Sequence, residues 1–287
     1  MCENSNMMEK HESFSVLMSV YYKEKPEYII ECFDSLLNQT CLANEWIVVE
    51  DGPLTREIYD VLDMYQEKNP GLIKRVPLKE NRGLGLALRE GILHCSNELI
   101  ARMDTDDIAR ENRFEKQLEE FSKDSKLDIC GSHIIEFDGT IENVLSKRKV
   151  PLTNDEIVKY QRRRSAYNHM TVMYKKSSVI KAGNYEHAPL MEDDMLWTRM
   201  ILSGCKGMNI DDYLVCARTG KDMIARRGGY SYFKKYKNSR NKIYKTGFIS
   251  YWDYIYTILV QFVVALIPRR MRMMLFLKLL RKTGDNE

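Results

Sequence analysis

Short apolar runs alternate with helical segments between residues 14 and 137, and this alternation constrains the fold more than any other feature. The predicted strands are residues 14–20, 45–50, 73–78, 98–103 and 128–137. The predicted helices are residues 26–37, 55–68, 83–94 and 113–122. Such alternation is typical of a mostly parallel sheet with right-handed crossover connections. In an α/β fold of this kind, ligands bind beyond the carboxyl ends of the strands.

The alternation decays after residue 140, where residues 147–167 predict helix or loop and residues 192–202 predict a short helix. A length of 287 residues is enough for one large α/β domain or two modest ones. Seven cysteines occur without a CxxC pair, which favours reduced thiols over a zinc site or a disulfide framework. Residues 1–13 lack the apolar core of a secretory signal, so we expect a cytoplasmic protein.

Charge is distributed unevenly along the chain. Residues 226–287 carry a net charge of +11, whereas residues 1–225 carry −8. Residues 230–256 include ten aromatic side chains interleaved with basic ones, and the uncharged stretch 254–268 follows. As a helix this stretch would be about 22 Å long, which is shorter than the roughly 30 Å core of a bilayer. The composition suits a helix on an anionic membrane surface; a site for single-stranded nucleic acid and an ordinary helical cap are the alternatives.

The run Asp104-Thr105-Asp106-Asp107 brings three carboxylates directly after a predicted strand. In an extended or turning backbone, the side chains of Asp104 and Asp106 point the same way. Carboxylates this close repel one another unless a cation is present, and Mg²⁺ or Mn²⁺ binds such groups together with phosphate oxygens. We interpret the cluster as a divalent metal site, with a solvated loop that caps the next helix as the alternative.

A second acidic run, Glu192-Asp193-Asp194, begins a predicted helix. Helix capping is a sufficient explanation, since each acid contributes about 0.3–1 kcal/mol there. A carboxylate beside a cleft is also a suitable general base for an acceptor hydroxyl. Both interpretations stay open from the residues alone.

Several other residues allow a functional and a structural interpretation. Asp51 ends a predicted strand and suits either a hydrogen bond to a base or ribose, or a simple turn. Arg226 and Arg227 precede two glycines and suit either a phosphate or a solvated basic turn. His169 is one of five histidines and, as a lone residue, favours a structural role. The segment at residues 83–88 departs from a dinucleotide fingerprint, and no P-loop motif occurs.

In order and spacing, five segments resemble family 2 glycosyltransferases of the GT-A fold, as found in bacterial O-antigen, capsule and exopolysaccharide synthesis. The segments are SVLMSVYYKEKPEYIIECFDSLLNQT, VVEDG, KENRGLGLALREGI, ELIARMDTDD and MEDDMLW. The resemblance covers residues 14–197 and extends more loosely to residues 226–229. Two departures are Pro53, where many members have Ser, and the lack of a clear histidine metal ligand after MEDDMLW.

The resemblance implies an α/β, Rossmann-like GT-A fold with a mostly parallel sheet flanked by helices. Residues 1–110 would form the nucleotide-sugar-binding half, and residues 111–225 the acceptor-binding and catalytic half. Residues 226–287 would form a basic, aromatic and amphipathic helical extension that associates with the membrane. The implied reaction is metal-dependent, inverting hexosyl transfer from a UDP-sugar to a polyprenyl-diphosphate-linked saccharide. The enzyme would be peripheral on the inner face of the cell membrane, with no nucleic acid partner.

The resemblance also assigns roles to single residues. Asp106 would ligate Mn²⁺ or Mg²⁺, Asp104 would contact the ribose or the metal shell, and Asp193 would be the catalytic base. The residues implied at the nucleotide-sugar are Val20, Tyr21, Asp51, Arg82, Asp104, Thr105 and Asp106. Those implied on the acceptor or phosphate side are Asn168, His169, Glu192, Trp197, Arg226 and Arg227.

Two other classes of protein fit parts of the pattern. A noncatalytic nucleotide-sugar- or nucleic-acid-binding module would use the same fold and a membrane-docking tail, but intact Asp104, Asp106 and Asp193 favour an enzyme. A nucleotidyltransferase also handles a metal and a diphosphate, but it needs a glycine-rich loop after the first strand. The segment VYYKEKPEY contains no glycine.

Overall fold

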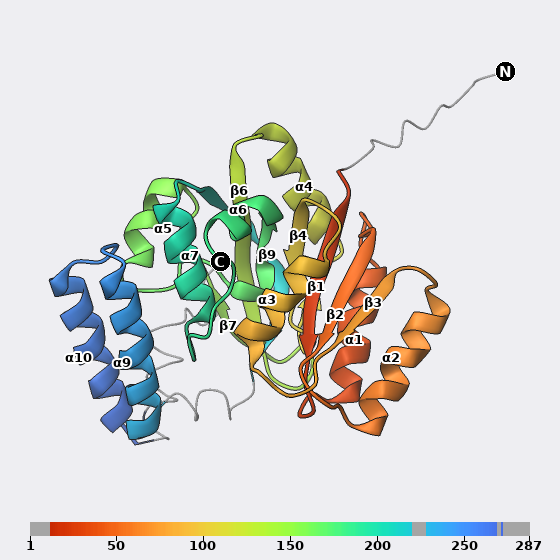
Figure 1. Ribbon diagram of the computed structural model, residues 1–287, viewed down its shortest axis with the longest axis horizontal. Helices are drawn as coiled ribbons and strands as arrows, with labels where there is room; N and C mark the ends of the chain where they lie inside the picture. Colours follow the sequence, from red (N-terminus) through yellow and green to blue (C-terminus); the bar gives the residue numbers. More distant parts are fainter. Residues whose placement is uncertain (1–11, 220–227, 269–270, 272–287) are drawn as a thin grey trace.

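A computed structural model describes residues 12–219, 228–268 and 271 of the chain. Its centre is a nine-stranded sheet in the order β3-β2-β1-β4-β8-β6-β9-β5, with β7 paired to β6 (Figure 1). The strands are β1 (Phe14–Val20), β2 (Glu45–Glu50), β3 (Ile73–Pro77), β4 (Leu99–Arg102), β5 (Ile108–Ala109), β6 (Leu127–Phe137), β7 (Val144–Arg148), β8 (Met173–Lys175) and β9 (Lys206–Arg218).

The sheet changes character at β8. From β3 to β4 all pairings are parallel, as expected for strands joined by crossover helices. β8 runs antiparallel to both β4 and β6, whereas β6 and β9 are parallel to each other. β5 and β7 add antiparallel pairings to β9 and β6. The sheet is therefore mixed: β3, β2, β1 and β4 form an all-parallel part, and the remaining strands combine parallel and antiparallel pairings.

Helices cover both faces of the sheet. One face packs against α1 (Pro26–Leu37), α2 (Arg56–Lys68) and α4 (Arg113–Lys123). The other packs against α3 (Leu84–His94), α5 (Asn154–Gln161), α6 (Lys176–Lys181) and α7 (Glu192–Leu202). A single 3₁₀ turn, η1 (His169–Thr171), leads into β8.

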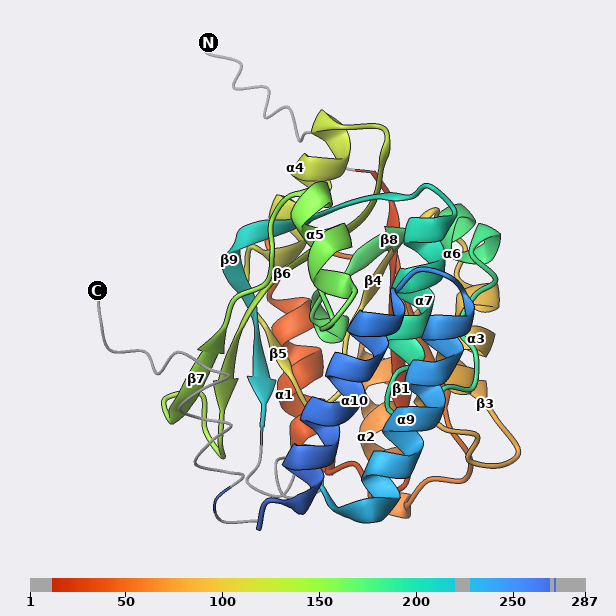
Figure 2. The same ribbon diagram turned by 90° about the vertical axis from the view of Figure 1, so that its left-hand side faces the viewer.

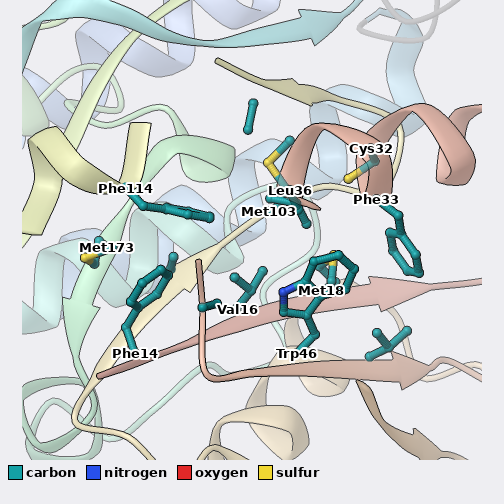
Figure 3. Packing of buried hydrophobic residues seen from close by; sticks show 14 of the residues in the cluster. Phe14, Val16, Met18, Cys32, Phe33, Leu36, Trp46, Met103, Phe114 and Met173 are labelled. Atoms are coloured by element: carbon teal, nitrogen blue, oxygen red, sulfur yellow. The ribbon is translucent and has the colours of Figure 1, made fainter. Parts of the chain in front are cut away.

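The core follows from the alternation of side chains along the strands. Phe14, Val16 and Met18 point to the face under α1 and α4, whereas Leu17 points to the face under α3. Figure 3 shows the apolar cluster on the face under α1 and α4. In this cluster the ring centroids of Phe33 and Trp46 lie 5.2 Å apart. Burial of this apolar surface from both faces is the main stabilising contribution.

Two C-terminal helices pack beside this α/β body. α9 (Gly229–Lys245) and α10 (Tyr251–Leu266) contact each other, and α9 also contacts α7 (Figures 1 and 2). One face of α10 exposes apolar side chains, namely Trp252, Tyr256, Leu259, Val260, Val263 and Leu266, which we call the α10 face. Within the ranges given above, none of the helices combines the length and apolar character that crossing a membrane requires.

The elements predicted up to residue 137 are confirmed with boundaries within one residue, apart from β5, which was not predicted. The later part of the chain differs from the prediction, because β7, β8 and β9 occur where no strand was predicted. β8 has only three residues, and Asp211 and Asp212 interrupt the apolar pattern of β9. The six cysteines in the described ranges are all free, in agreement with reduced thiols.

Candidate active site

The carboxyl ends of three neighbouring strands, β2, β1 and β4, bring the predicted nucleotide residues together. Asp51 follows β2, and its backbone N–H donates to the carbonyl of Val20 at the end of β1, at 2.8 Å. Thr105 follows β4, and its hydroxyl donates to the carbonyl of Ser19 at 3.5 Å. Tyr21 comes directly after Val20 and is half-buried. Parallel pairing of β2, β1 and β4 thus places residues that are far apart in the sequence at one edge of the sheet.

The Asp51 carboxylate connects two elements of the site. Its Oδ1 accepts the backbone N–H of Arg82 at 2.7 Å, and its Oδ2 accepts that of Gly83 at 2.9 Å. Gly83 is the N-cap of α3, so Asp51 satisfies donors that the start of this helix leaves without partners. The Arg82 side chain is exposed. Asp51 therefore holds the start of α3 against the end of β2.

Three carboxylates converge just beyond β4. One oxygen of each of Asp104, Asp106 and Asp107 lies within 4.8 Å of the others. Asp107 is buried and its Oδ1 accepts the backbone N–H of Arg218 at 2.7 Å, which fixes that side chain. Oxygen ligands at this spacing are the donor set that hard divalent cations prefer. These three residues are able to hold such an ion.

Burial and the closeness of like charges raise the pKa values of carboxyl groups in and beside the cluster. Burial and the Asp104 carboxylate raise the pKa of Asp106 to about 6. Burial, with the carboxylates of Asp106 and Asp104, raises the pKa of Asp107 well above its ordinary value. Burial and the same two aspartates raise the pKa of Glu24, in the loop after β1, to about 8. A cation placed among these groups would relieve the repulsion that adds to the effect of burial on these pKa values.

Arg102, the last residue of β4, is a buried cation beside the cluster. Its Nη2 lies 2.5 Å from Asp104 Oδ1, while its Nε and Nη1 have no hydrogen-bond partner within the described residues. Burial alone would lower the pKa of Arg102, but its interactions with Asp104, Tyr185 and Asp107 together outweigh burial and raise it. The same charge opposes the upward pKa shifts of Glu192 and Asp193. Arg102 therefore acts electrostatically on both acidic groups.

The second acidic run forms the first turn of α7, as predicted. Burial and the carboxylates of Asp194 and Glu192 raise the pKa of Asp193 well above its ordinary value, which makes its carboxylate a stronger base. Asp194 instead points toward α5, where its Oδ1 accepts from Gln161 Nε2 at 2.8 Å. Gly85 allows α3 to approach, because a Cβ there would lie 2.8 Å from the Cβ of Glu192. Close packing of α3 thus requires a glycine in this motif.

Three residues expected on the acceptor side are part of the core instead. The His169 Nε2 is 2.8 Å from the Tyr185 hydroxyl, and burial lowers the pKa of His169 well below its ordinary value. Trp197 is buried and makes an edge contact with His169, with ring centroids 5.9 Å apart. Asn168 Nδ2 donates to the carbonyl of Ser132 at 2.8 Å. The structure therefore gives these side chains a packing role in the core, where Trp197 of α7 meets η1.

The family model described as "Glycosyl transferase family 2" matches residues 15–187. This chain is a member of that family. Its fold is the GT-A fold of these glycosyltransferases. At 16% identity, the mannosyltransferase PcManGT from Pyrobaculum calidifontis, solved with GDP-Man and Mn²⁺, has a TM-score of 0.62 over 82% of this chain and 65% of its own.

Two curated relatives of this family 2 glycosyltransferase have high similarity. The amylovoran biosynthesis glycosyltransferase AmsE of Erwinia amylovora is 40% identical over 221 residues, covering 77% of this chain and 82% of AmsE. The UDP-Gal:alpha-D-GlcNAc-diphosphoundecaprenol beta-1,3-galactosyltransferase of Escherichia coli is 35% identical over 276 residues, covering 96% of this chain and 99% of the relative.

The candidate site includes residues that no sequence motif marked. Arg102 was one, although a charged residue inside the apolar run ELIARM was an available signal. Glu24 and Arg218 were others, and they come next to the cluster only through the tertiary fold, so no local pattern marks them. Arg226 and Arg227 lie outside the described residues.

Proposed function

We propose that this glycosyltransferase moves a hexose from a UDP-sugar to a polyprenyl-diphosphate-linked saccharide, with inversion at the anomeric carbon, during surface polysaccharide synthesis. The observation that carries the proposal is the carboxylate cluster Asp104, Asp106 and Asp107 beside the β1 and β2 ends. Support for the substrates comes from the Escherichia coli relative, whose name specifies UDP-Gal and a GlcNAc-diphosphoundecaprenol acceptor. The name of AmsE, amylovoran biosynthesis glycosyltransferase, supports a role in polysaccharide synthesis.

The donor nucleotide lies against Val20, Tyr21 and Asp51 in this proposal, with Arg82 and Thr105 near the phosphates and ribose. Asp106 and Asp104 would hold a divalent ion, Mn²⁺ or Mg²⁺, because their clustered, repelling carboxylates suit a hard cation. Such an ion supplies Lewis-acid neutralisation of the departing diphosphate. Asp107 adds a third carboxylate to the cluster, and its Oδ1 is fixed by the backbone N–H of Arg218.

Asp193 performs the proton transfer. As the acceptor hydroxyl oxygen bonds to the anomeric carbon, the bond from that carbon to the UDP oxygen breaks and the hydroxyl proton passes to the Asp193 carboxylate. The raised pKa of Asp193 brings its basicity closer to what this transfer requires. One displacement from the face opposite UDP inverts the configuration, and no covalent enzyme intermediate forms. Glu192, next to Asp193, borders the acceptor side.

The C-terminal region docks the enzyme on the inner face of the cell membrane, where a lipid-linked acceptor is located. Residues 226–287 carry a net charge of +11, which suits anionic headgroups. The apolar α10 face belongs to the helix that packs against the lysine-rich α9, and it suits the interfacial region of a bilayer.

Calorimetry with UDP, with and without Mn²⁺, tests the nucleotide site. We expect wild-type enzyme to bind UDP more tightly with Mn²⁺, and Asp106→Ala to lose most of that gain because a metal ligand is missing. Binding that ignores Mn²⁺ in both proteins would contradict a metal site at Asp106. Absence of UDP binding under all conditions would contradict the proposed donor.

A further inference from the structure

The segment that leads into α7 is clamped between two helices. It comprises residues 183–191 and connects α6 to the catalytic turn. On the α3 side, Arg89 Nη1 donates to the carbonyl of Tyr185 at 2.9 Å, and Asn184 Nδ2 donates to the carbonyl of Arg89 at 3.0 Å. These bonds hold the first half of the segment to the α/β body.

The second half of the segment is held by α9. Ser239 Oγ donates to the carbonyl of Pro189 at 2.9 Å, and Ser239 is only 1% exposed. Lys242 Nζ, one helical turn later, donates to the carbonyl of His187 at 2.8 Å. Two side chains of the C-terminal hairpin therefore bind backbone carbonyls that lie four and six residues before Asp193.

A separate apolar cluster joins the same elements. Its buried members are Ala188, Met191, Met195, Ile243 and Ile249. Met191 is the N-cap of α7 and Met195 lies in its next turn, so the two methionines flank Glu192, Asp193 and Asp194. The catalytic turn consequently packs on α9 and on the α9–α10 connection, in addition to the sheet.

The backbone of this segment is strained just before the catalytic turn. Leu190 has φ of +71°, in the left-handed region, although it has a branched side chain. Such a conformation is unfavourable for a residue with a Cβ and persists where surrounding contacts hold it. The Ser239 bond to the preceding carbonyl is one such contact.

We propose that α9 is a positioning element for the catalytic base, in addition to its part in membrane docking. Through Ser239, Lys242 and Ile243, it sets the path of residues 187–191 and thereby the place of Asp193. The inference rests on the proposed function only in treating Asp193 as the base. It assigns the two sides of the hairpin different tasks: the inner side of α9 holds the active site, and the α10 face contacts lipid.

Steady-state kinetics of Ser239→Ala and Lys242→Met test this positioning role, in detergent with a dispersed polyprenyl-diphosphate-linked acceptor. We expect kcat to fall about tenfold, corresponding to about 1.4 kcal/mol. KM for the UDP-sugar should stay within about twofold, since the donor site lies on other elements. Asn238→Ala changes the neighbouring exposed side chain and Lys242→Arg retains the donor; both should keep the wild-type kcat. An unchanged kcat in Ser239→Ala and Lys242→Met would overturn the proposal.

Amide hydrogen exchange gives a second readout that does not depend on turnover. We expect faster exchange over residues 187–195 in Ser239→Ala and Lys242→Met, with unchanged exchange in the strands of the sheet. Unchanged exchange at 187–195 would overturn the positioning role even if activity fell. If the wild-type enzyme transfers no sugar from any UDP-sugar, the proposed function fails, while the exchange result still decides whether α9 holds the segment.

Discussion

The Arg102 guanidinium and the Asp104 carboxylate form an ion pair of 2.5 Å in which the arginine side chain is 1% exposed and the aspartate 29%. The pair joins the interior end of β4 to the acidic cluster. A buried cation here limits the repulsion among carboxylates that would otherwise disfavour their convergence. It therefore makes an acidic site compatible with a packed sheet.

Replacement of Arg102 tests this pair. Arg102→Met should lower the free energy of unfolding by about 2 kcal/mol, because it leaves Asp104 without its buried partner. Breaking a buried ion pair usually costs more than this. Here the substitution also removes the buried Nε and Nη1 of Arg102, which have no hydrogen-bond partner within the described residues, and this offsets part of the cost. Arg56→Met is the matched control: its pair with Asp60 is exposed and contributes at most about 0.5 kcal/mol. Urea denaturation measures both, and equal losses would contradict a stabilising role for Arg102.

The Asp193→Asn variant separates chemistry from donor binding. We expect transfer to fall by at least about a hundredfold, because the amide cannot accept the hydroxyl proton, while UDP affinity stays near wild type. Asp194→Asn is the control, since its Oδ1 would still accept the bond from Gln161. Radiolabel transfer and calorimetry supply the two measurements. Equal loss of UDP affinity in Asp193→Asn and Asp106→Ala would contradict separate roles.

Asp106 makes a pH-dependent contribution to stability. Its pKa is raised from 3.8 to about 6, so the folded protein binds a proton more tightly than the unfolded chain does. The contribution of Asp106 to the free energy of unfolding is fully present below about pH 4 and is lost as the pH rises through about 6. Asp106→Asn should therefore raise Tm near neutral pH and leave it unchanged below about pH 4. A Tm gain that is the same at both pH values would contradict the raised pKa of Asp106 and its origin in burial and the Asp104 carboxylate.

The α10 face should determine binding to lipid surfaces. Leu259→Ser should weaken co-sedimentation with vesicles that contain phosphatidylglycerol, because it removes apolar area from the face that contacts the membrane. Leu93→Ser is a matched control, since Leu93 on α3 is 57% exposed and Leu259 is 58% exposed. Equal loss in both variants, or none in Leu259→Ser, would contradict docking through α10.

The local sequence determined the parallel half of the fold and the position of the metal candidates. Buried parallel strands are nearly continuous apolar runs, so β1, β2 and β4 can be predicted from the sequence without tertiary information. Asp51 and Asp104 follow directly from the ends of these strands. α7 was also predicted with its observed bounds, because acids mark its first turn and apolar residues follow.

Tertiary structure alone decided which residues surround those aspartates. β8 and β9 gain their stability from partners more than 25 residues away, so their short or interrupted apolar patterns carry little local signal. Arg102 is buried because β4 lies between β1 and β8 in the sheet, and His169 is buried beside Trp197, which α7 brings into the core. The contacts of α9 with residues 187–191 are side-chain hydrogen bonds to backbone carbonyls. Every residue has a backbone carbonyl, so the sequence does not show which one will be bound. Sequence patterns report periodic burial, whereas contacts of this kind depend on where the folded chain brings two segments together.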